Sequence, residues 1–326
     1  MTRSYRPIDP RRIKTYSVKK RHHKAAVDAM ASLPQVGASA AELIASLPDF
    51  LGAKALRTVV EWVIDAFKND RPVAVACGAH VIKVGCGPIL IDLIDRGIVK
   101  AIACNGATAI HDAELALFGE TSEEVADTIR DGTFGMVEET LGFFADVVTL
   151  AKRESIGLGA AVGRRLIESE VPHAPRSVFA AAHRAGIPAC VHVGIGTDTV
   201  HVAGALDGAA LGEASMHDFR LICDVVSDLG AKPGAQVGGV WLNIGSAVVM
   251  PEVFLKAVSV ARNLGADLDC MCTANFDMIR HYRPNQNVVT RPVTKGRGCE
   301  VIGHHEIMLP LLRQAVIEGL AAAKRS

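Results

Sequence analysis

Beyond residue 70, short apolar runs recur along the chain, each followed by small or polar residues such as Gly, Asn or His and then by a longer stretch of helical periodicity. Nearly continuous apolar strands separated by helices are typical of a parallel sheet that is covered on both faces. We therefore expect an α/β fold with a mostly parallel six-stranded sheet and helices on both faces. The stretch 121–185, mostly helical in pattern, lies between the second and third expected strands. The expected strands are Pro72–Cys77, Val99–Cys104, Pro188–Val193, Gly239–Ile244, Leu268–Cys272 and Glu300–Gly303.

The first 69 residues show no such alternation of strand and helix. Their pattern predicts helices at about 21–32, 39–46 and 53–68, so we divide the chain into a basic arm with N-terminal helices (1–69) and an α/β domain (70–326). Residues 1–24 carry nine Lys and Arg residues against one acidic residue, Asp9, so the arm has a formal charge of +8 in a neutral chain. Such an arm is typical of a solvated tail, and docking onto an acidic neighbouring subunit is the alternative.

Charge and cysteine usage restrict the class of partner and the compartment. Lys plus Arg and Asp plus Glu are both 35, and this balance argues against a dedicated nucleic-acid binder, which needs a large positive field. The sequence has no apolar run of about 18 residues and no leader-like apolar segment behind its basic start. Eight scattered cysteines are typical of reduced cytosolic proteins. We expect a cytoplasmic protein with no membrane or nucleic-acid partner.

Histidines and carboxylates gather where the expected strands end. In open parallel sheets, ligands bind outside the carboxyl ends of the strands, because the loops there vary freely and helix N-termini offer amide donors. The loops also contain Asp198, Asp277 and Glu306. The sequence therefore predicts a polar pocket at this edge that takes a small molecule. The histidines in these loops are His80, His111, His201, His304 and His305.

Each of these side chains has more than one possible role. An imidazole can satisfy buried backbone groups, act as an acid or base near neutral pH, or bind a metal. Adjacent residues such as His304 and His305 rarely share one ion, and no His-x-His or His-Glu-x-x-His spacing is present, so we expect no metal centre. Asp198 and Asp277 either cap helices or bind ribose hydroxyls. The candidates for acid and base are His80, His111, His201 and Glu306.

Two short motifs are interpreted as structural. Gly157, Gly159 and Gly163 fit a loose G-x-G-x-x-x-G pattern, but the segment before them is charged and helical, whereas a dinucleotide fingerprint follows a strand. We expect a joint between two helices there. Cys270 and Cys272 form one close pair without a second pair of ligands, so they are weak evidence for zinc.

The strand-end loops together resemble the signatures of the deoxyhypusine synthase family, in the same order, over about residues 70–320. The resemblance implies a Rossmann-like domain with an N-terminal helical extension, bound NAD, and a homotetramer with active sites between paired subunits. Members of that family oxidise spermidine with NAD and pass its aminobutyl group, through an imine on a lysine, to a lysine of a translation factor. The segments that carry the resemblance are Gly78–Gly85, Cys104–Asp112, Gly196–Asp198, Asn243–Val249, Thr273–Asp277 and Gly303–Pro310.

The resemblance also implies roles for individual residues. His111 stands where the family has a catalytic-site glutamate. The residues that stand where the family contacts NAD are Asn105, Gly106, Asp198, Gly245, Thr273, Ala274, Asp277, His304 and His305.

The chain departs from the family at the acceptor lysine and at the substrate. The Trp-Gly-Lys motif that carries that lysine is missing, and Lys295, the one lysine in that interval, lies several residues away. Imine chemistry needs an amine at bonding distance, so we expect no synthesis of deoxyhypusine. Arg280 and Arg283 would repel a polycation and attract an anion, which makes them candidates for substrate binding.

We therefore expect a NAD-binding enzyme that oxidises a small substrate or transfers a group on it. Arg280 and Arg283 would allow that substrate to carry a carboxylate. Two alternatives stay open. One is a metal-dependent hydrolase or lyase that uses the same histidines and Glu306. The other is a non-catalytic ligand-binding protein of the same fold, because fold alone does not fix function.

Overall fold

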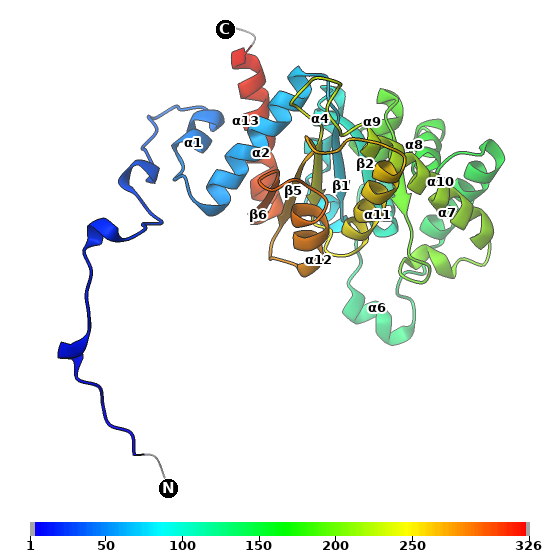
Figure 1. Ribbon diagram of the computed structural model, residues 1–326. Helices are drawn as coiled ribbons and strands as arrows, with labels where there is room; N and C mark the ends of the chain where they lie inside the picture. The colour runs from blue at the N-terminus through cyan, green and yellow to red at the C-terminus, as the bar shows by residue number, and fades with distance from the viewer. Residues whose placement is uncertain (1–3, 324–326) are drawn as a thin grey trace.

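The sheet has six strands, all parallel, in the order β3-β2-β1-β4-β5-β6 (Figure 1). The computed structural model describes residues 4–323. The expected α/β class, with a Rossmann-like sheet, is confirmed, and the sheet is wholly parallel within that range. The strand order places a topological switch point between β1 and β4. The strands are β1 (Val73–Cys77), β2 (Val99–Asn105), β3 (Ala189–His192), β4 (Val240–Ile244), β5 (Cys272–Asp277) and β6 (Gly298–Ile302).

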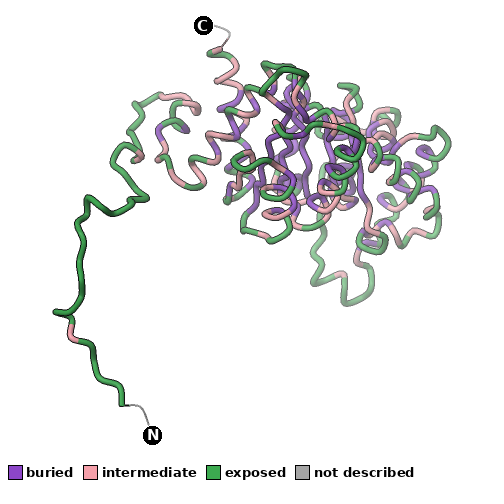
Figure 2. Tube along the Cα trace, in the orientation of Figure 1, coloured by how far each residue is buried: buried purple, intermediate pink, exposed green. Residues whose placement is uncertain are grey.

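Helices cover both faces of the sheet, and the buried residues form two apolar cores between the layers (Figure 2). In the smaller core Trp241 stacks on Phe254 with ring centroids 4.4 Å apart. The smaller core packs against α11 (Val249–Asn263), the π-helical segment η6 (Asn285–Thr290) and the C-terminal half of α10 (Gly208–Ser227). The larger core packs against α2 (Leu51–Lys68), α4 (Gly87–Asp95), α5 (Gly106–Phe118), α8 (Leu158–Glu168), α9 (Val178–Ala185) and α13 (His305–Ala323). No helix among residues 4–323 is both long and apolar enough to cross a bilayer.

The stretch between β2 and β3 is helical, as its pattern indicated. It contains α6 (Val125–Asp131) and α7 (Glu138–Glu154), and it continues through α8 to α9. Gly157 precedes α8, which confirms the joint between two helices. A Cβ on Gly159 would lie 2.1 Å from the carbonyl oxygen of Ala189, so this glycine lets α8 pack against β3. The G-x-G-x-x-x-G pattern therefore serves helix packing.

The N-terminal region is less helical than its sequence indicated. The expected helices at 39–46 and 53–68 correspond to α1 (Ala40–Ser46) and α2, but the expected helix at 21–32 is wrong. Residues 18–36 contain only the short 3-10 turns Val18–Lys20 and Val27–Ala29, and almost all of them are exposed. A short helix without a packed face is marginal in water. The arm consequently extends away from the body, largely exposed (Figures 1 and 2).

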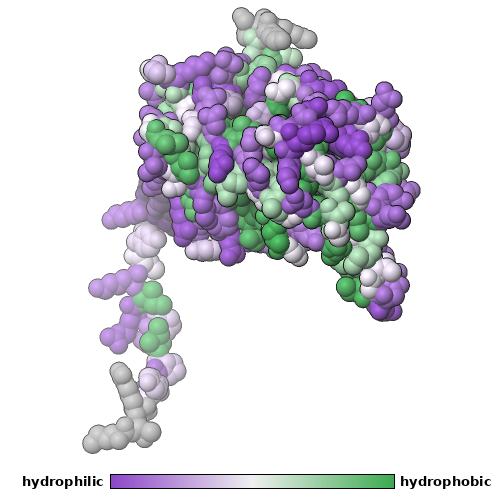
Figure 3. All heavy atoms as spheres, turned by 90° about the vertical axis from the view of Figure 1, so that its right-hand side faces the viewer, coloured by the Kyte–Doolittle hydropathy of each residue, from purple (hydrophilic) through white to green (hydrophobic). Residues whose placement is uncertain are grey.

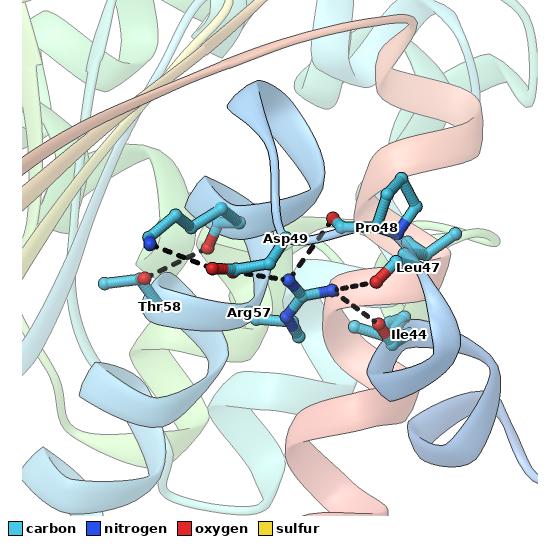
Figure 4. Close-up of polar contacts among 7 residues, drawn as sticks. Ile44, Leu47, Pro48, Asp49, Arg57 and Thr58 are labelled. Atoms are coloured by element: carbon cyan, nitrogen blue, oxygen red, sulfur yellow. Dashed lines mark hydrogen bonds and ion pairs between the residues drawn. The ribbon is translucent and has the colours of Figure 1, made fainter. Parts of the chain in front are cut away.

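Arg57 on α2 joins the N-terminal segment to the body (Figure 4). Its guanidinium donates to the carbonyl oxygen of Leu47 at 2.7 Å and to the carboxylate of Asp49 at 2.8 Å, so it satisfies backbone acceptors at the end of α1. On the other side, the amide of Ala41 donates to the carboxylate of Glu318 on α13 at 2.8 Å. Figure 1 shows α1 and α2 beside α13.

The fifth strand lies further along the chain than its apolar pattern indicated. Leu268–Cys272 was expected as the strand and 273–277 as the loop, but β5 is Cys272–Asp277. The amide of Asp269 donates to the carboxylate of Asp267 at 3.0 Å in a turn that precedes the strand. Thr273 can be buried in β5 because its hydroxyl donates to a carbonyl oxygen of η6 at 2.7 Å.

Candidate functional site

The loops after β1 and β4 meet at the switch point. A Cβ on Gly78 would lie 2.1 Å from the carbonyl oxygen of Gly245, and Gly245 has a φ of +64°. Both positions therefore need glycine, one for the close approach of two backbones and the other for its conformation. The edge formed by the carboxyl ends of the strands is the place where α/β sheets of this order bind ligands. In Figure 1, α12 (Tyr282–Pro284) and the projecting α6 segment lie at this end of the sheet.

A pocket of about 540 Å³ opens at this edge beside α5. Its walls are α3 (Ala79–Lys83), α5, residues 118–137 and the loop that precedes the 3-10 helix η5 (Thr199–Val202). Its size is within the range of small-molecule sites, about 300–1,000 Å³. Figure 3 shows apolar side chains near the projecting α6 segment, where Val125, Ile129 and Met136 are exposed. The charged side chains of the pocket are Lys83, Glu114, Glu120, Glu123 and Asp198.

His111 lies in this pocket as part of a hydrogen-bonded chain. Its Nδ1 is 2.6 Å from the hydroxyl oxygen of Thr121, and that hydroxyl donates to Oε2 of Glu114. The other oxygen of Glu114 accepts from the hydroxyl of Thr140 at 3.0 Å. Burial lowers the pKa of His111, which Glu114 opposes and Lys83 reinforces. This lowering favours the neutral imidazole, which is the form that a general base requires.

Asp198 covers the N-terminus of α5. A Cβ on Gly106, the first residue of α5, would lie 2.1 Å from Oδ2 of Asp198, so this glycine admits the carboxylate. Burial raises the pKa of Asp198. In the loop that carries Asp198, Nδ1 of His201 accepts hydrogen bonds from the amides of Gly196 and Asp198 at 3.1 and 3.3 Å. An anion at a helix N-terminus is favourable, so Asp198 holds a position that a phosphate would otherwise find attractive.

A second histidine cluster lies at the switch point. The rings of His80 and His305 are 6.0 Å apart at centroid. His305 is buried, its pKa is lowered by that burial, and neither of its ring nitrogens has a hydrogen-bond partner. Its Nε2 lies 2.8 Å from the position of a Cβ on Gly245, so it faces the backbone between β4 and α11. A buried polar group without a partner is uncommon and marks a place where a ligand or water would be stabilised.

The structure thus places the four predicted acid/base candidates in different surroundings. His111 lines the α5 pocket with Asp198, while His80 lies beside His305. The ring of His201 stabilises the loop before η5 by accepting a hydrogen bond from a backbone amide of that loop. Glu306 is exposed and 3.7 Å from the ring of His304, which is also exposed.

The residues for which the resemblance implies NAD contacts also differ in their surroundings. The side chain of Asn105 caps α5 by accepting from the amide of Thr108 at 3.0 Å. Thr273 and Ala274 have no exposed surface inside β5. The NAD contact that the resemblance implies for these two residues stays a prediction. Asp277 ends β5 beside His305, and its Oδ1 accepts from the amide of Met278 at 2.8 Å.

The two arginines that were expected to attract an anionic substrate are paired with carboxylates. Arg280 forms an ion pair with the buried carboxylate of Glu300, and Nε of Arg283 is 3.2 Å from Glu252. Neither lines the α5 pocket, which contains one lysine and four carboxylates. The pocket therefore has the opposite charge to the one that Arg280 and Arg283 led us to expect.

Three residues of the pocket were not predicted from the sequence. Glu114 lies three residues after His111, so helical spacing could have indicated it. Thr121 belongs to a connecting segment that no motif identified, and Lys83 lies within the segment Gly78–Gly85 but was not singled out as a site residue.

No group of three or more His, Cys, Asp or Glu residues within 4–323 has an arrangement that could hold a metal ion. Cys272 is buried in β5, where its thiol lies 3.9 Å from the carbonyl oxygen of Cys270. The alternative of a metal-dependent hydrolase consequently gains no set of ligands from the described residues.

No family model matches this chain, and no curated protein matches it either. Among solved structures it is similar to AgrE in a complex with ornithine and NAD+, with a TM-score of 0.54 and 14% identity over 82% of this chain and 34% of AgrE. It is also similar to a conserved protein of Methanococcus maripaludis S2, provisionally assigned as LOR/SDH, with a TM-score of 0.50 and 15% identity over 87% of this chain and 71% of the other.

A protein of Entamoeba histolytica, provisionally assigned as a deoxyhypusine synthase, gives a TM-score of 0.49 and 13% identity over 94% of this chain and 97% of the other. This chain spans about a third of the length of AgrE. At these identities the likeness to AgrE and to the LOR/SDH protein establishes the α/β fold, and the deoxyhypusine synthase family stays a resemblance.

Proposed function

We propose that this chain is a NAD-binding enzyme that oxidises, or transfers a group from, a small amine in the α5 pocket, with His111 as the general base. The observation that carries the proposal is the chain Glu114–Thr121–His111. It presents a neutral imidazole to a pocket of about 540 Å³ at the ligand-binding edge of the sheet. A base with a lowered pKa in such a pocket is the usual mark of a site for proton transfer.

The residues at the switch point fit a dinucleotide. The ring of His305 packs against Gly245, and both of its buried nitrogens lack hydrogen-bond partners. Asp277 ends the neighbouring strand, where a carboxylate can accept from ribose hydroxyls. Oδ2 of Asp198 and Nε2 of His201 face one another at 3.7 Å in the loop after β3, and neither atom has a hydrogen bond. The fold is shared with AgrE, whose structure contains NAD+. The dinucleotide would be held by Gly245, Asp277 and His305.

Bound NAD would supply the acceptor for a hydride. The residues of this chain would do the rest: Nε2 of His111 would take the proton that the substrate amine releases, and Asp198 and Glu114 would stabilise the cationic substrate before that step. The lowered pKa of His111 keeps its lone pair available, and its neutrality avoids repulsion of an ammonium group.

The charge of the pocket is the basis for choosing an amine. One lysine faces four carboxylates, so a cationic molecule would be attracted and a carboxylate-bearing one repelled. The substrate class proposed here therefore differs from the anion that Arg280 and Arg283 suggested.

Transfer through an imine on Lys295 is not part of the proposal. Lys295 is exposed in the turn before β6. This turn lies at the amino ends of the strands, whereas the α5 pocket lies at their carboxyl ends. We therefore keep the expectation that the chain does not make deoxyhypusine. The cytoplasmic location and the homotetramer implied by the resemblance also stay predictions, and sedimentation velocity would test the assembly.

The experiment is an assay of NADH formation with NAD+ and a panel of small amines without a carboxylate, including putrescine and spermidine, against carboxylates of similar size. We expect turnover with at least one amine, and a fall of about a hundredfold in kcat for His111→Asn. His183→Asn, an exposed histidine on α9, is the matched control and should retain full activity. Turnover that survives His111→Asn, or that occurs only with carboxylates, would contradict the proposal.

A further inference from the structure

The hydrogens of the His111 chain can be assigned by counting donors. A threonine hydroxyl has one hydrogen, and a carboxylate has none to give. The hydroxyl of Thr121 donates to Oε2 of Glu114, so its only hydrogen is used there. Its oxygen is nevertheless 2.6 Å from Nδ1 of His111, a distance at which one of the two atoms must donate. The donor of that bond is therefore Nδ1–H.

We propose that Thr121 is a positioning residue, which fixes neutral His111 in the tautomer with its proton on Nδ1 and its lone pair on Nε2. This inference rests on the proposed function for its role, because only a base needs a defined lone pair. It adds a residue outside the helix of the base and states which ring nitrogen accepts the substrate proton.

Glu114 does not fix the tautomer of His111 by a direct hydrogen bond. Its Oε2 is 3.8 Å from Nδ1 of His111, which is too long for a hydrogen bond. The hydroxyl of Thr121 fills the gap, and Thr140 on α7 holds the other oxygen of Glu114 at 3.0 Å. Thr140 is buried, so the carboxylate has a fixed support on that side. The orientation of the imidazole therefore depends on three separate segments.

The segment that carries Thr121 is tied down by its own contacts. Thr121 lies between α5 and α6, and nearby Glu123 accepts from the amide of Gly135 at 2.7 Å. Gly135 in turn packs closely on Thr199 of η5, because a Cβ at this position would lie 2.6 Å from the side chain of Thr199. The projecting α6 segment is thus closed at its base, and the position of Thr121 is set by the fold.

The charged groups that act on His111 do not by themselves choose a tautomer. Glu114 raises the pKa of His111 and Lys83 lowers it, and both act on the charge of the ring as a whole. The hydrogen bond to one nitrogen is what distinguishes Nδ1 from Nε2. Replacing the hydroxyl of Thr121 by a methyl group removes that distinction while leaving both charges in place.

The experiment is nitrogen NMR of the full chain with 15N-labelled histidine at pH 8, with the His111 signals assigned by their loss in His111→Asn. The imidazole nitrogens report directly which one carries hydrogen. We expect Nδ1–H in the wild type and in Thr121→Ser, and a population shifted to Nε2–H in Thr121→Val. With an amine that the enzyme turns over, Thr121→Val should lower kcat by about tenfold or more with little change in KM, and Thr121→Ser should restore it.

Thr149→Val, an exposed threonine on α7, is the control for the loss of a hydroxyl and should change neither readout. Nε2–H in the wild type would overturn the inference even if Thr121→Val fails to fold, and so would Nδ1–H that persists in a folded Thr121→Val. If no substrate on the panel is turned over, the NMR result still decides the tautomer, so failure of the proposed function can be told from failure of this inference.

Discussion

Asp218 on α10 is a buried carboxylate whose titration should be visible in the stability of the protein. Its Oδ2 accepts from the amide of Gly159 at 2.9 Å and from that of Val191 at 2.8 Å, so it joins α10 to α8 and β3. Burial raises the pKa of Asp218 from its ordinary value of 3.8 to about 7, against the effect of these amides. The carboxylate therefore gains hydrogen bonds but loses more solvation.

The sign of the effect follows from the raised pKa. The unfolded chain releases the proton near pH 4, while the folded chain holds it to about pH 7. The contribution of Asp218 to stability is thus fully present below pH 4 and is lost as the pH rises through 7. Three pKa units correspond to about 4 kcal/mol over the whole range, of which about 1 kcal/mol falls between pH 6 and pH 8.

Asp218→Asn removes this titration because an amide is neutral at every pH. We expect the free energy of unfolding of the variant, relative to that of the wild type, to rise by about 1 kcal/mol from pH 6 to pH 8. Urea unfolding at both values measures the difference. His192, whose pKa burial lowers to about 4, acts in the opposite direction, but it is present in both proteins and cancels.

Asp224→Asn, an exposed position on the same helix, is the control for removing a carboxylate. A difference between Asp218→Asn and the wild type that does not change with pH would refute the reasoning. So would a difference that falls as the pH rises.

Two further predictions concern packing. Arg57→Ala removes the donors that hold the end of α1, so limited proteolysis should cut residues 36–50 at least several times faster while the body stays resistant; an unchanged rate would contradict the anchoring role. Gly159→Ala places a methyl group 2.1 Å from a backbone carbonyl oxygen and should lower the free energy of unfolding by about 2 kcal/mol or more. Gly142→Ala on α7 has open space and should raise it by about 0.5–1 kcal/mol, and equal effects at the two glycines would count against the packing of α8 on β3.

The architecture could be predicted because each buried parallel strand is a nearly continuous apolar run. Five of the six strands lie where such runs indicated. The exception, β5, contains the polar residues Thr273 and Asn275. The hydroxyl of Thr273 donates to η6 and Oδ1 of Asn275 accepts from Asn243, and a hydropathy pattern cannot show such tertiary hydrogen bonds. The helix predicted at 21–32 does not form for a similar reason. The pattern of apolar residues in a sequence does not show whether the fold offers a surface for a helix to pack against.

The sequence predicted which edge of the sheet carries the site, but it predicted fewer of the individual residues that form it. Strand ends converge in any parallel sheet, so His111 and Asp198 could be expected near one another. His80 and His305, however, lie beside one another and are not among the residues that line this pocket. Thr121 comes from the connection between α5 and α6, and the contact of a connecting segment with a helix depends on the tertiary fold.

A crystal structure of the full chain grown with NAD+ would show whether this edge of the sheet binds the cofactor. We expect a dinucleotide along the carboxyl ends of β1, β4 and β5, against the backbone of Gly245 and the ring of His305, with its nicotinamide toward His111. The buried nitrogens of His305 should then have hydrogen-bond partners. A dinucleotide bound elsewhere, or an edge without one at saturating NAD+, would contradict the proposed NAD site.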